Sequence, residues 1–197
     1  MLLLHKLESI RHQIVDREMK LSDALLLVLR CLREIVPEDR LVWVNRELLG
    51  YRQDDLEALS EQHMGLNIFL AWISESRKRP VLEVPSYRFL DGVWGRIDQS
   101  GRLIAVVEPE LAQRQIFCNI GIQQIELQLD EIEAPADALF SLSYDERTGA
   151  EFFCESRELV RVYDHVRFKL IEFLDKVIAE SRQRCRAGST FRRTFGS

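Results

Sequence analysis

The chain has 197 residues, of which 46% are hydrophobic and 30% charged, and its formal net charge is −5. A chain of this length can bury one hydrophobic core and a small second hydrophobic cluster, and the charged fraction suits a soluble helical protein. No stretch approaches the ~18 apolar residues of a membrane span, and His5 and Lys6 interrupt the leucine run at residues 2–4, which argues against a signal peptide. We therefore expect a cytoplasmic protein without a membrane partner.

The charge is unevenly distributed along the chain. No acid follows Glu180, and the last residues carry five arginines: Arg182, Arg184, Arg186, Arg192 and Arg193. The net charge therefore combines +5 from this segment with −10 from residues 1–181. An acidic body disfavours nucleic-acid binding over the whole surface, but the basic segment remains a candidate anion contact.

The first three predicted helices cover residues 3–18, 22–36 and 38–50. In the third, Leu41, Val44 and Leu48 recur at helical spacing, and Gly50 suits the left-handed residue that ends many helices. Trp43 points away from this stripe, so we expect the helix to be buried on several sides. Glu47 lies on the same helix and needs a countercharge if it is buried.

Residues 52–84 read as an insertion with two short helices, at 54–62 and 66–76. The second ends in a basic triplet, Arg77-Lys78-Arg79, beside Trp72. Such a triplet can contact phosphate, but cations also favour helix C-termini, and we consider that reading the stronger one.

The pattern changes to strands after Pro85. Residues 87–90 and 93–97 are predicted strands joined by an Asp91-Gly92 hairpin turn, and residues 103–107 form a third strand after a turn at 98–101. We predict a three-stranded antiparallel meander packed on a helical bundle, which is a mainly α (α+β) fold.

The C-terminal half is less uniform. A helical region starts at Pro109, and Cys118 to Leu129 shows helical spacing. Residues 132–150 give no assignment beyond a turn at 145–149. The last helix has the clearest stripe, from Leu159 to Val177, and the basic segment from Ser181 is expected to be a flexible tail.

No complete catalytic constellation is evident. Arg161 and His165 lie one helical turn apart and are similar to the Arg-x-x-x-x-His type motif of helical HEPN ribonucleases, but here the spacing is shorter. Both fall opposite the apolar stripe, where an ordinary solvent-facing role is the simpler interpretation. His5 and His12 share a helix face without a third ligand, and the four scattered cysteines indicate reduced thiols. We expect no metal and no cofactor.

The remaining polar residues on apolar segments suggest a buried ion pair. We expect Glu47 to pair with Arg88 or Arg167 where the third helix, the meander and the last helix meet, because a buried carboxylate needs neutralising. A ligand pocket lined by these residues is the alternative interpretation.

The same residues carry a family resemblance. The chain resembles the AbiTii domain of bacterial abortive-infection systems in four motifs: Leu25-x4-Arg30-Cys31-Leu32, Trp43-x3-Glu47-Leu48-x-Gly50-Tyr51, Pro85-x-Tyr87-Arg88 and Asp164-x-Val166-Arg167-x3-Ile171. The likeness spans about residues 3–178, so we expect one domain over residues 1–180, with residues 52–84 inserted.

The resemblance implies a component of anti-phage defence and no defined reaction. We expect a non-catalytic interaction or regulatory module that self-associates or holds a partner effector. The alternatives are a toxin-type ribonuclease using Arg161 and His165, and a nucleic-acid-binding accessory using the basic tail alone, which we do not favour.

Overall fold

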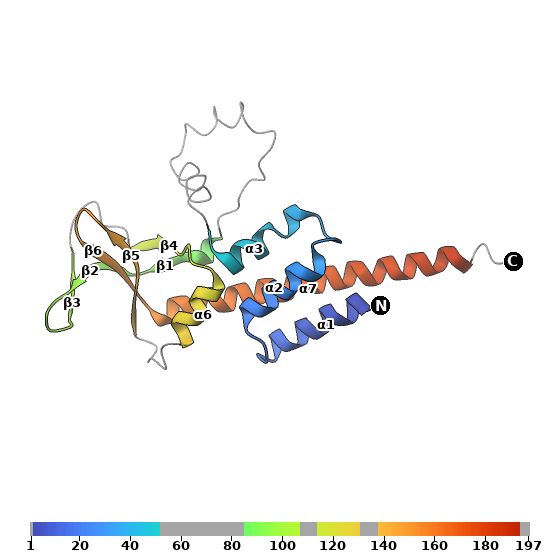
Figure 1. Cartoon of the computed structure of the whole chain (residues 1–197), viewed down its shortest axis with the longest axis horizontal. Coiled ribbons are helices and arrows are strands. Elements are labelled where there is room, and N and C mark those ends of the chain that lie inside the picture. The colour runs from blue at the N-terminus through green and yellow to red at the C-terminus, as the bar shows by residue number, and fades with distance from the viewer. Residues whose placement is uncertain (1, 52–84, 107–113, 131–137, 194–197) are drawn as a thin grey trace, which may run out of the picture. The chain divides into compact units, whose positions relative to one another are not determined.

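The computed structural model describes residues 2–51, 85–106, 114–130 and 138–193, with side chains described up to residue 183 (Figure 1). The chain divides into two compact units, described separately below. The helical unit comprises Met1–Leu49 and Asp164–Ser197, and the sheet unit comprises Gly50–Tyr163. The fold is α+β, as expected; a single domain over residues 1–180 stays a prediction.

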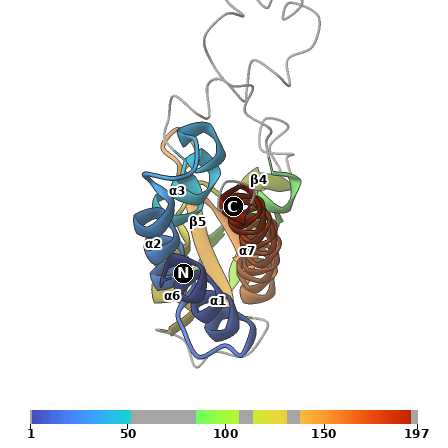
Figure 2. The same cartoon turned by 90° about the vertical axis from the view of Figure 1, so that its right-hand side faces the viewer.

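The helical unit is built from short N-terminal helices and the long last helix. Its elements are α1 (Leu2–Val15), α2 (Leu21–Leu32), the 3-10 helix η1 (Glu38–Arg40), α3 (Val42–Leu49) and the part of α7 (Ser156–Arg193) from Asp164 onward. Figure 2 shows α1, α2 and α3 beside α7 within this unit. The predicted helices are thus confirmed, with shifted boundaries.

Apolar stripes at helical spacing explain why these helices pack. Each helix buries one face and leaves polar residues outside, which is the pattern that excludes water from a core. The buried stripes are Leu7, Ile10 and Ile14 on α1; Leu25, Val28 and Leu32 on α2; Val44 and Leu48 on α3; and Val166, Leu170, Leu174 and Val177 on α7.

Helix α3 is buried along one face, but Leu49 is 63% exposed, so the expected burial on several sides is confirmed only in part. Val44, Glu47 and Leu48 are buried, Trp43 is half-buried, and Asn45 is exposed. Gly50 follows with φ +91°, as expected for the left-handed residue after a helix. The helix is shorter than predicted, because residues 38–40 form the separate turn η1.

The described residues of the sheet unit form two antiparallel sheets in place of the expected single meander. One sheet has four strands in the order β3-β2-β6-β5, and the other pairs β1 with β4. The strands are β1 (Phe89–Asp91), β2 (Val93–Ile97), β3 (Leu103–Ala105), β4 (Gln115–Phe117), β5 (Leu139–Asp145) and β6 (Ala150–Glu155). The β2–β3 hairpin is confirmed, but the three-stranded meander is wrong.

Gly92 explains the error. A type I′ turn at Asp91-Gly92 would need positive φ, and Gly92 is not among the positive-φ glycines. A Cβ on Gly92 would lie 2.3 Å from the carbonyl oxygen of Phe153 and 2.5 Å from the ring of Phe152. The glycine therefore permits β6 to approach closely, and the chain passes from one sheet to the other instead of reversing.

The C-terminal part of the sheet unit departs further from expectation. Helix α6 spans Ile122–Asp130, whereas we predicted a start at Cys118, and β4 precedes it. Strands β5 and β6 were not predicted, although the turn between them was, and Gly149 there has φ +64°. Three consecutive residues of β6, Phe152 to Cys154, are buried, so the strand shows no apolar–polar alternation.

Helix α7 also continues past the expected end at Ser181, to Arg193. The start of the basic tail is therefore helical, and its flexibility stays a prediction. The predicted helices within residues 52–84 and near Pro109 lie outside the described residues.

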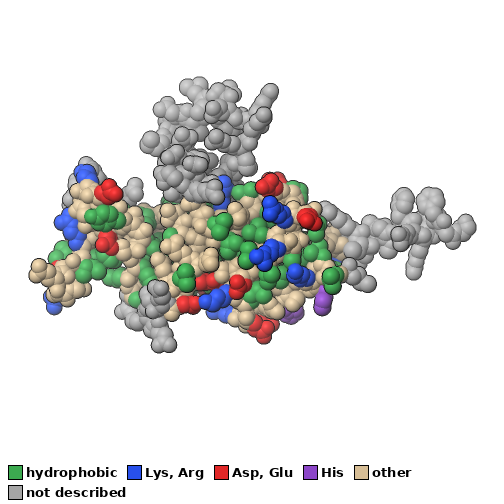
Figure 3. Space-filling view, in the orientation of Figure 1, with side chains coloured by type: hydrophobic (Ala, Val, Ile, Leu, Met, Phe, Trp, Pro, Cys, Tyr) green, Lys and Arg blue, Asp and Glu red, His purple; other side chains and the backbone are tan. Residues whose placement is uncertain are grey.

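None of the helices that the structure describes is long and apolar enough to span a bilayer. On the face shown in Figure 3, acidic, basic and hydrophobic side chains are interspersed.

Candidate functional site

The motif residues of the sheet unit meet around a buried arginine. Arg88 is fully buried, and its guanidinium donates to the carbonyl oxygens of Cys118 at 3.2 Å and Ile120 at 2.5 Å. Its Cζ atom lies 5.3 Å from the centroid of the Tyr51 ring, which is a cation–π distance. We call Gly50, Tyr51, Arg88, Cys118 and Ile120 the Arg88 junction.

Local backbone geometry builds this junction. Arg88 ends the 3-10 turn η2 (Ser86–Arg88), where a strand was expected, and its carbonyl oxygen accepts from the amide of Cys118 at 2.8 Å. On the other side, Gly50 forms a β-bridge with Ile120, and the Tyr51 amide donates to the Asn119 carbonyl at 2.8 Å. The segment 118–121 thus contacts both Arg88 and the Gly50–Tyr51 pair.

Sequence reasoning missed residues 118–121 because they contribute main-chain atoms. Carbonyl oxygens belong to every residue, so they leave no mark in a pattern of side chains. Gly50 was the one available signal, because a Cβ there would lie 2.5 Å from the Asn119 carbonyl oxygen and 2.9 Å from the Gly121 nitrogen. The expected residues Gly50, Tyr51 and Arg88 do come together, and Tyr87 lies half-buried beside them in η2.

Arg161 has a structural role that differs from the expected solvent-facing one. Its guanidinium donates to the carbonyl oxygens of Tyr87 at 3.3 Å and Phe89 at 2.6 Å, and it pairs with Glu158 at 2.7 Å. Glu158 also accepts from the Asp91 amide at 3.2 Å. The expectation that Arg161 faces solvent is wrong, because it ties the start of α7 to β1.

His165 is exposed, as expected, one turn further along α7. Phosphate binding by the pair would have to compete with the contacts that Arg161 already makes, including an ion pair to Glu158. This arrangement counts against the ribonuclease interpretation.

The other motif residues lie in the helical unit. Arg167 pairs with Asp164 at 3.0 Å, and Arg17 approaches the same carboxylate at 3.7 Å. Trp43 packs edge-on against Phe173 with 5.5 Å between ring centroids, and the Lys169 ammonium lies 5.0 Å from the Trp43 ring.

Glu47 is completely buried, as the predicted ion pair requires. Its pairing with Arg88 or Arg167 stays a prediction, and Arg88 belongs to the other unit.

The remaining candidates are dispersed. Arg182 pairs with Glu8 at 2.6 Å, whereas the side chains of Arg184 and Arg186, and the whole triplet at 77–79, lie outside the described residues. His12 lies 3.7 Å from Asp16 on an exposed surface. Among the residues described, no three histidines, cysteines or acids come close enough together to hold a metal ion.

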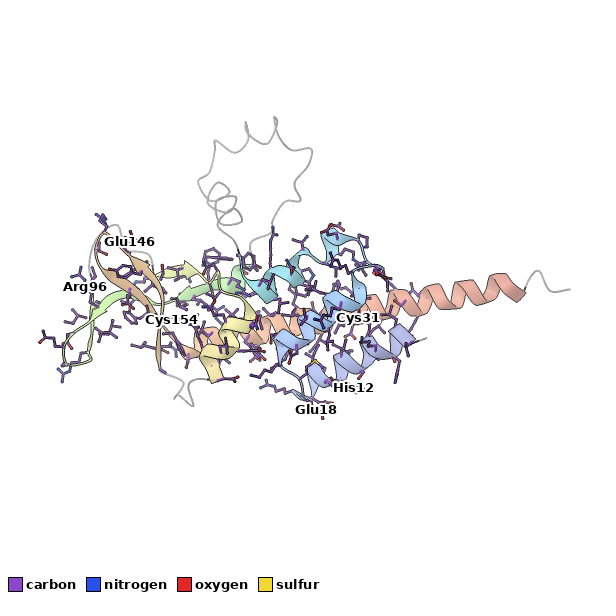
Figure 4. The ribbon with its side chains drawn as sticks, in the orientation of Figure 1. His12, Glu18, Cys31, Arg96, Glu146 and Cys154 are labelled. Atoms are coloured by element: carbon purple, nitrogen blue, oxygen red, sulfur yellow. The ribbon has the colours of Figure 1, made fainter. Side chains whose placement is uncertain are left out.

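Cys154 is a buried thiol, and we considered whether it could serve as a nucleophile. It lies on β6 in the sheet unit, and Cys31 lies on α2 (Figure 4). Burial raises the pKa of Cys154 to about 12, with nearby Cys118 contributing in the same direction. The thiolate is the reactive form, so this thiol should be inert at neutral pH.

We therefore expect iodoacetamide at pH 8 to alkylate half-buried Cys31 in the native protein while Cys154 reacts only after unfolding. Peptide mass spectrometry with and without urea measures both sites. Because the folded pKa is raised, the stabilisation from this thiol is complete below the unfolded pKa and declines as the pH rises towards 12. Rapid native labelling of Cys154 would contradict the prediction.

Comparison of the chain with family models, curated proteins and solved structures finds no match.

Proposed function

We propose that this chain is a cytoplasmic, non-catalytic interaction module of a bacterial anti-phage system, acting by self-association or by holding a partner effector. The resemblance to the AbiTii domain suggests the defence setting. The proposal that the module has no reaction centre rests on the structural contacts that its motif residues make.

The Arg88 junction is the observation that carries the proposal. A catalytic or ligand-binding arginine needs access to its substrate, whereas Arg88 is fully buried and donates to two main-chain carbonyls. Gly50 and Tyr51 likewise contact the 118–121 segment through their main chains. Three residues that carry the resemblance, Gly50, Tyr51 and Arg88, thus help to hold the sheet unit together, as expected where a family shares a scaffold.

The four-stranded sheet offers a surface for such a module. One face buries Phe140, Ala150, Phe152 and Cys154. The strand register places four exposed apolar side chains on the opposite face, where they surround the buried Phe153: Val93, Ile97, Leu139 and Tyr144. We call these four the open sheet face. Exposed apolar side chains that share one face often mark a protein contact.

A pair of isoleucines allows a matched test. Ile97 is 59% exposed on the open sheet face, and Ile104 is 56% exposed on the opposite face of the same hairpin. We expect Ile97→Ser combined with Tyr144→Ser to reduce the oligomer mass or the amount of captured partner at least about tenfold, because ~1.4 kcal/mol of lost contact suffices. Ile104→Ser should leave both unchanged.

Light scattering after size exclusion measures the mass, and affinity capture from phage-infected cells recovers partners. A strictly monomeric wild-type protein that captures nothing would overturn the proposal. Loss of phage protection in a folded His165→Ala variant would instead favour the ribonuclease alternative.

A further inference from the structure

The open sheet face carries a carboxylate among its apolar side chains. Glu151 lies on β6, two residues before Phe153, and alternate residues of a strand share a face. The register pairs Glu151 with Gly95 of β2 and with Tyr144 of β5. Glu151 is half-buried in this position, and none of the described lysines, arginines or histidines pairs with it.

The neighbours of Glu151 do not supply a counterion. Gly95 has no side chain, and a Cβ there would lie 2.6 Å from Cδ1 of Leu103, so an apolar group occupies that side. Glu155 is the second carboxylate that strand alternation places on this face, and it already pairs with Arg157 at 2.6 Å. In the part of the chain that the structure describes, Glu151 is therefore the carboxylate of this face that has no cation beside it.

The size of the open sheet face matches one α-helix. The register places Leu139 opposite Glu155, four residues from Glu151 along β6, and Ile97 lies two residues beyond the β2 partner of Glu151 in the other direction. Together these steps span about 20 Å at ~3.3 Å per residue, and β2 and β5 lie two strand spacings, or about 10 Å, apart. A helix with its side chains is about 10–12 Å wide, and about 13 residues of it are 20 Å long.

A partner that covers this face must neutralise Glu151. Contact with the partner removes water from the carboxylate, and a carboxylate that is buried without a counterion is strongly unfavourable. A lysine or arginine on the partner supplies that counterion, whereas an acidic or wholly apolar partner leaves the charge uncompensated.

A second copy of the chain, placed face to face, fits less well. Glu151 lies near the middle of the open sheet face, so a two-fold axis through this face would bring the two carboxylates of a dimer close together. Like charges at short range repel each other. The charge of the face therefore favours a different, basic partner.

We infer that the open sheet face holds one amphipathic helix of a partner protein, which carries a lysine or arginine beside its apolar residues. The cation pairs with Glu151, and the apolar side chains of the helix cover Ile97 and Tyr144. The inference rests on the proposed function, because it names the chemistry of the partner that the module holds.

Fluorescence anisotropy with the full-length protein and two synthetic helices tests the inference. One labelled peptide of about 14 residues carries leucines on one face and lysines on the other, and the second has glutamate in place of each lysine. We expect the lysine peptide to bind at least about tenfold more tightly than the glutamate peptide. Glu151→Gln should weaken binding of the lysine peptide about tenfold and leave that of the glutamate peptide unchanged or tighter.

Glu146→Gln is the matched control, because Glu146 is an exposed carboxylate in the turn between β5 and β6 (Figure 4). It should leave both affinities within about twofold. Equal weakening of the lysine peptide by Glu151→Gln and Glu146→Gln would overturn the inference, because it would indicate general attraction to an acidic protein. Both variants should keep the circular-dichroism melting curve of the wild type, since neither carboxylate has an ion pair among the described residues.

Two isoleucine variants locate the bound peptide. Ile97→Ser should weaken the lysine peptide at least about fivefold, and Ile104→Ser, on the opposite face of the hairpin, should leave it unchanged. If Ile97→Ser weakened both peptides while Glu151→Gln changed neither, the inference would fail but the proposed function would stand, since the face would still contact protein. A lysine peptide that does not bind the wild type would also overturn the inference.

Discussion

Replacing Arg88 with alanine is expected to lower the free energy of unfolding by about 3–5 kcal/mol. The side chain is fully buried, and its removal would leave the carbonyl oxygens of Cys118 and Ile120 without the donor that now reaches them. Hydrogen bonds from a charged donor contribute about 1.5–3 kcal/mol each, and the Tyr51 ring would lose its cation.

Two control substitutions separate the possible causes. Arg88→Met fills most of the volume but donates no hydrogen bond, so it should recover only the packing part of the loss. Arg157 is 70% exposed in an ion pair with Glu155, and Arg157→Ala should change stability by less than about 1 kcal/mol.

Urea unfolding followed by circular dichroism measures all three variants. In thermal unfolding, a chain of this size should show a melting temperature that is lower by roughly 10 °C for Arg88→Ala than for the wild type. A melting curve identical to that of the wild type would show that Arg88 does not hold the junction.

The helices could be predicted because their signal is local. The stripe from Leu159 to Val177 repeats every three or four residues, and one face of one helix produces it. The same holds for α1 to α3, where the errors were confined to the ends. Residues 38–40 were included in the third helix because the acids Glu38 and Asp39 suit a helix start and only Leu41 separates η1 from α3.

The sheet could not be predicted in the same way, because strand pairing is not local. The local β2–β3 hairpin was predicted, but β1 pairs with β4 and the other edge of β2 pairs with β6. Both of these partners lie more than 20 residues further along the chain, although Asp91-Gly92 has the composition of a hairpin turn. The residues next to Gly92 in the sequence do not indicate that the ring of Phe152 occupies the space that a side chain at position 92 would need. The conformation of that glycine is set by tertiary contact.

The candidate site shows both outcomes. The burial of Glu47 and Arg88 was predicted, because a charged residue on an apolar segment must be buried with partners or turned outward. The acceptors of Arg88 were not predicted, since they are carbonyls 30 and 32 residues away. The role of Arg161 was missed for the same reason: two of its partners are main-chain oxygens.

Gly50→Ala should be nearly as destabilising as Arg88→Ala, for a steric reason. Gly50 has φ +91°, and a Cβ there would lie 2.5 Å from the Asn119 carbonyl oxygen and 2.9 Å from the Gly121 nitrogen. Both neighbours are main-chain atoms, so no side-chain rotation can relieve the contact. We expect a loss of about 2–5 kcal/mol, combining ~1–2 for the left-handed conformation with ~1–3 for overpacking.

Gly101→Ala is the matched control, because Gly101 has a similar φ of +80° but no atom within 4 Å of the added Cβ. It carries the conformational cost alone, so it should lower the free energy of unfolding by about 1–2 kcal/mol. The difference between the two variants, measured in urea, isolates the close approach of Gly50 to residues 119–121. If the two losses were equal, Gly50 would be required only for its backbone angles, and the junction would have room for a side chain beside Asn119.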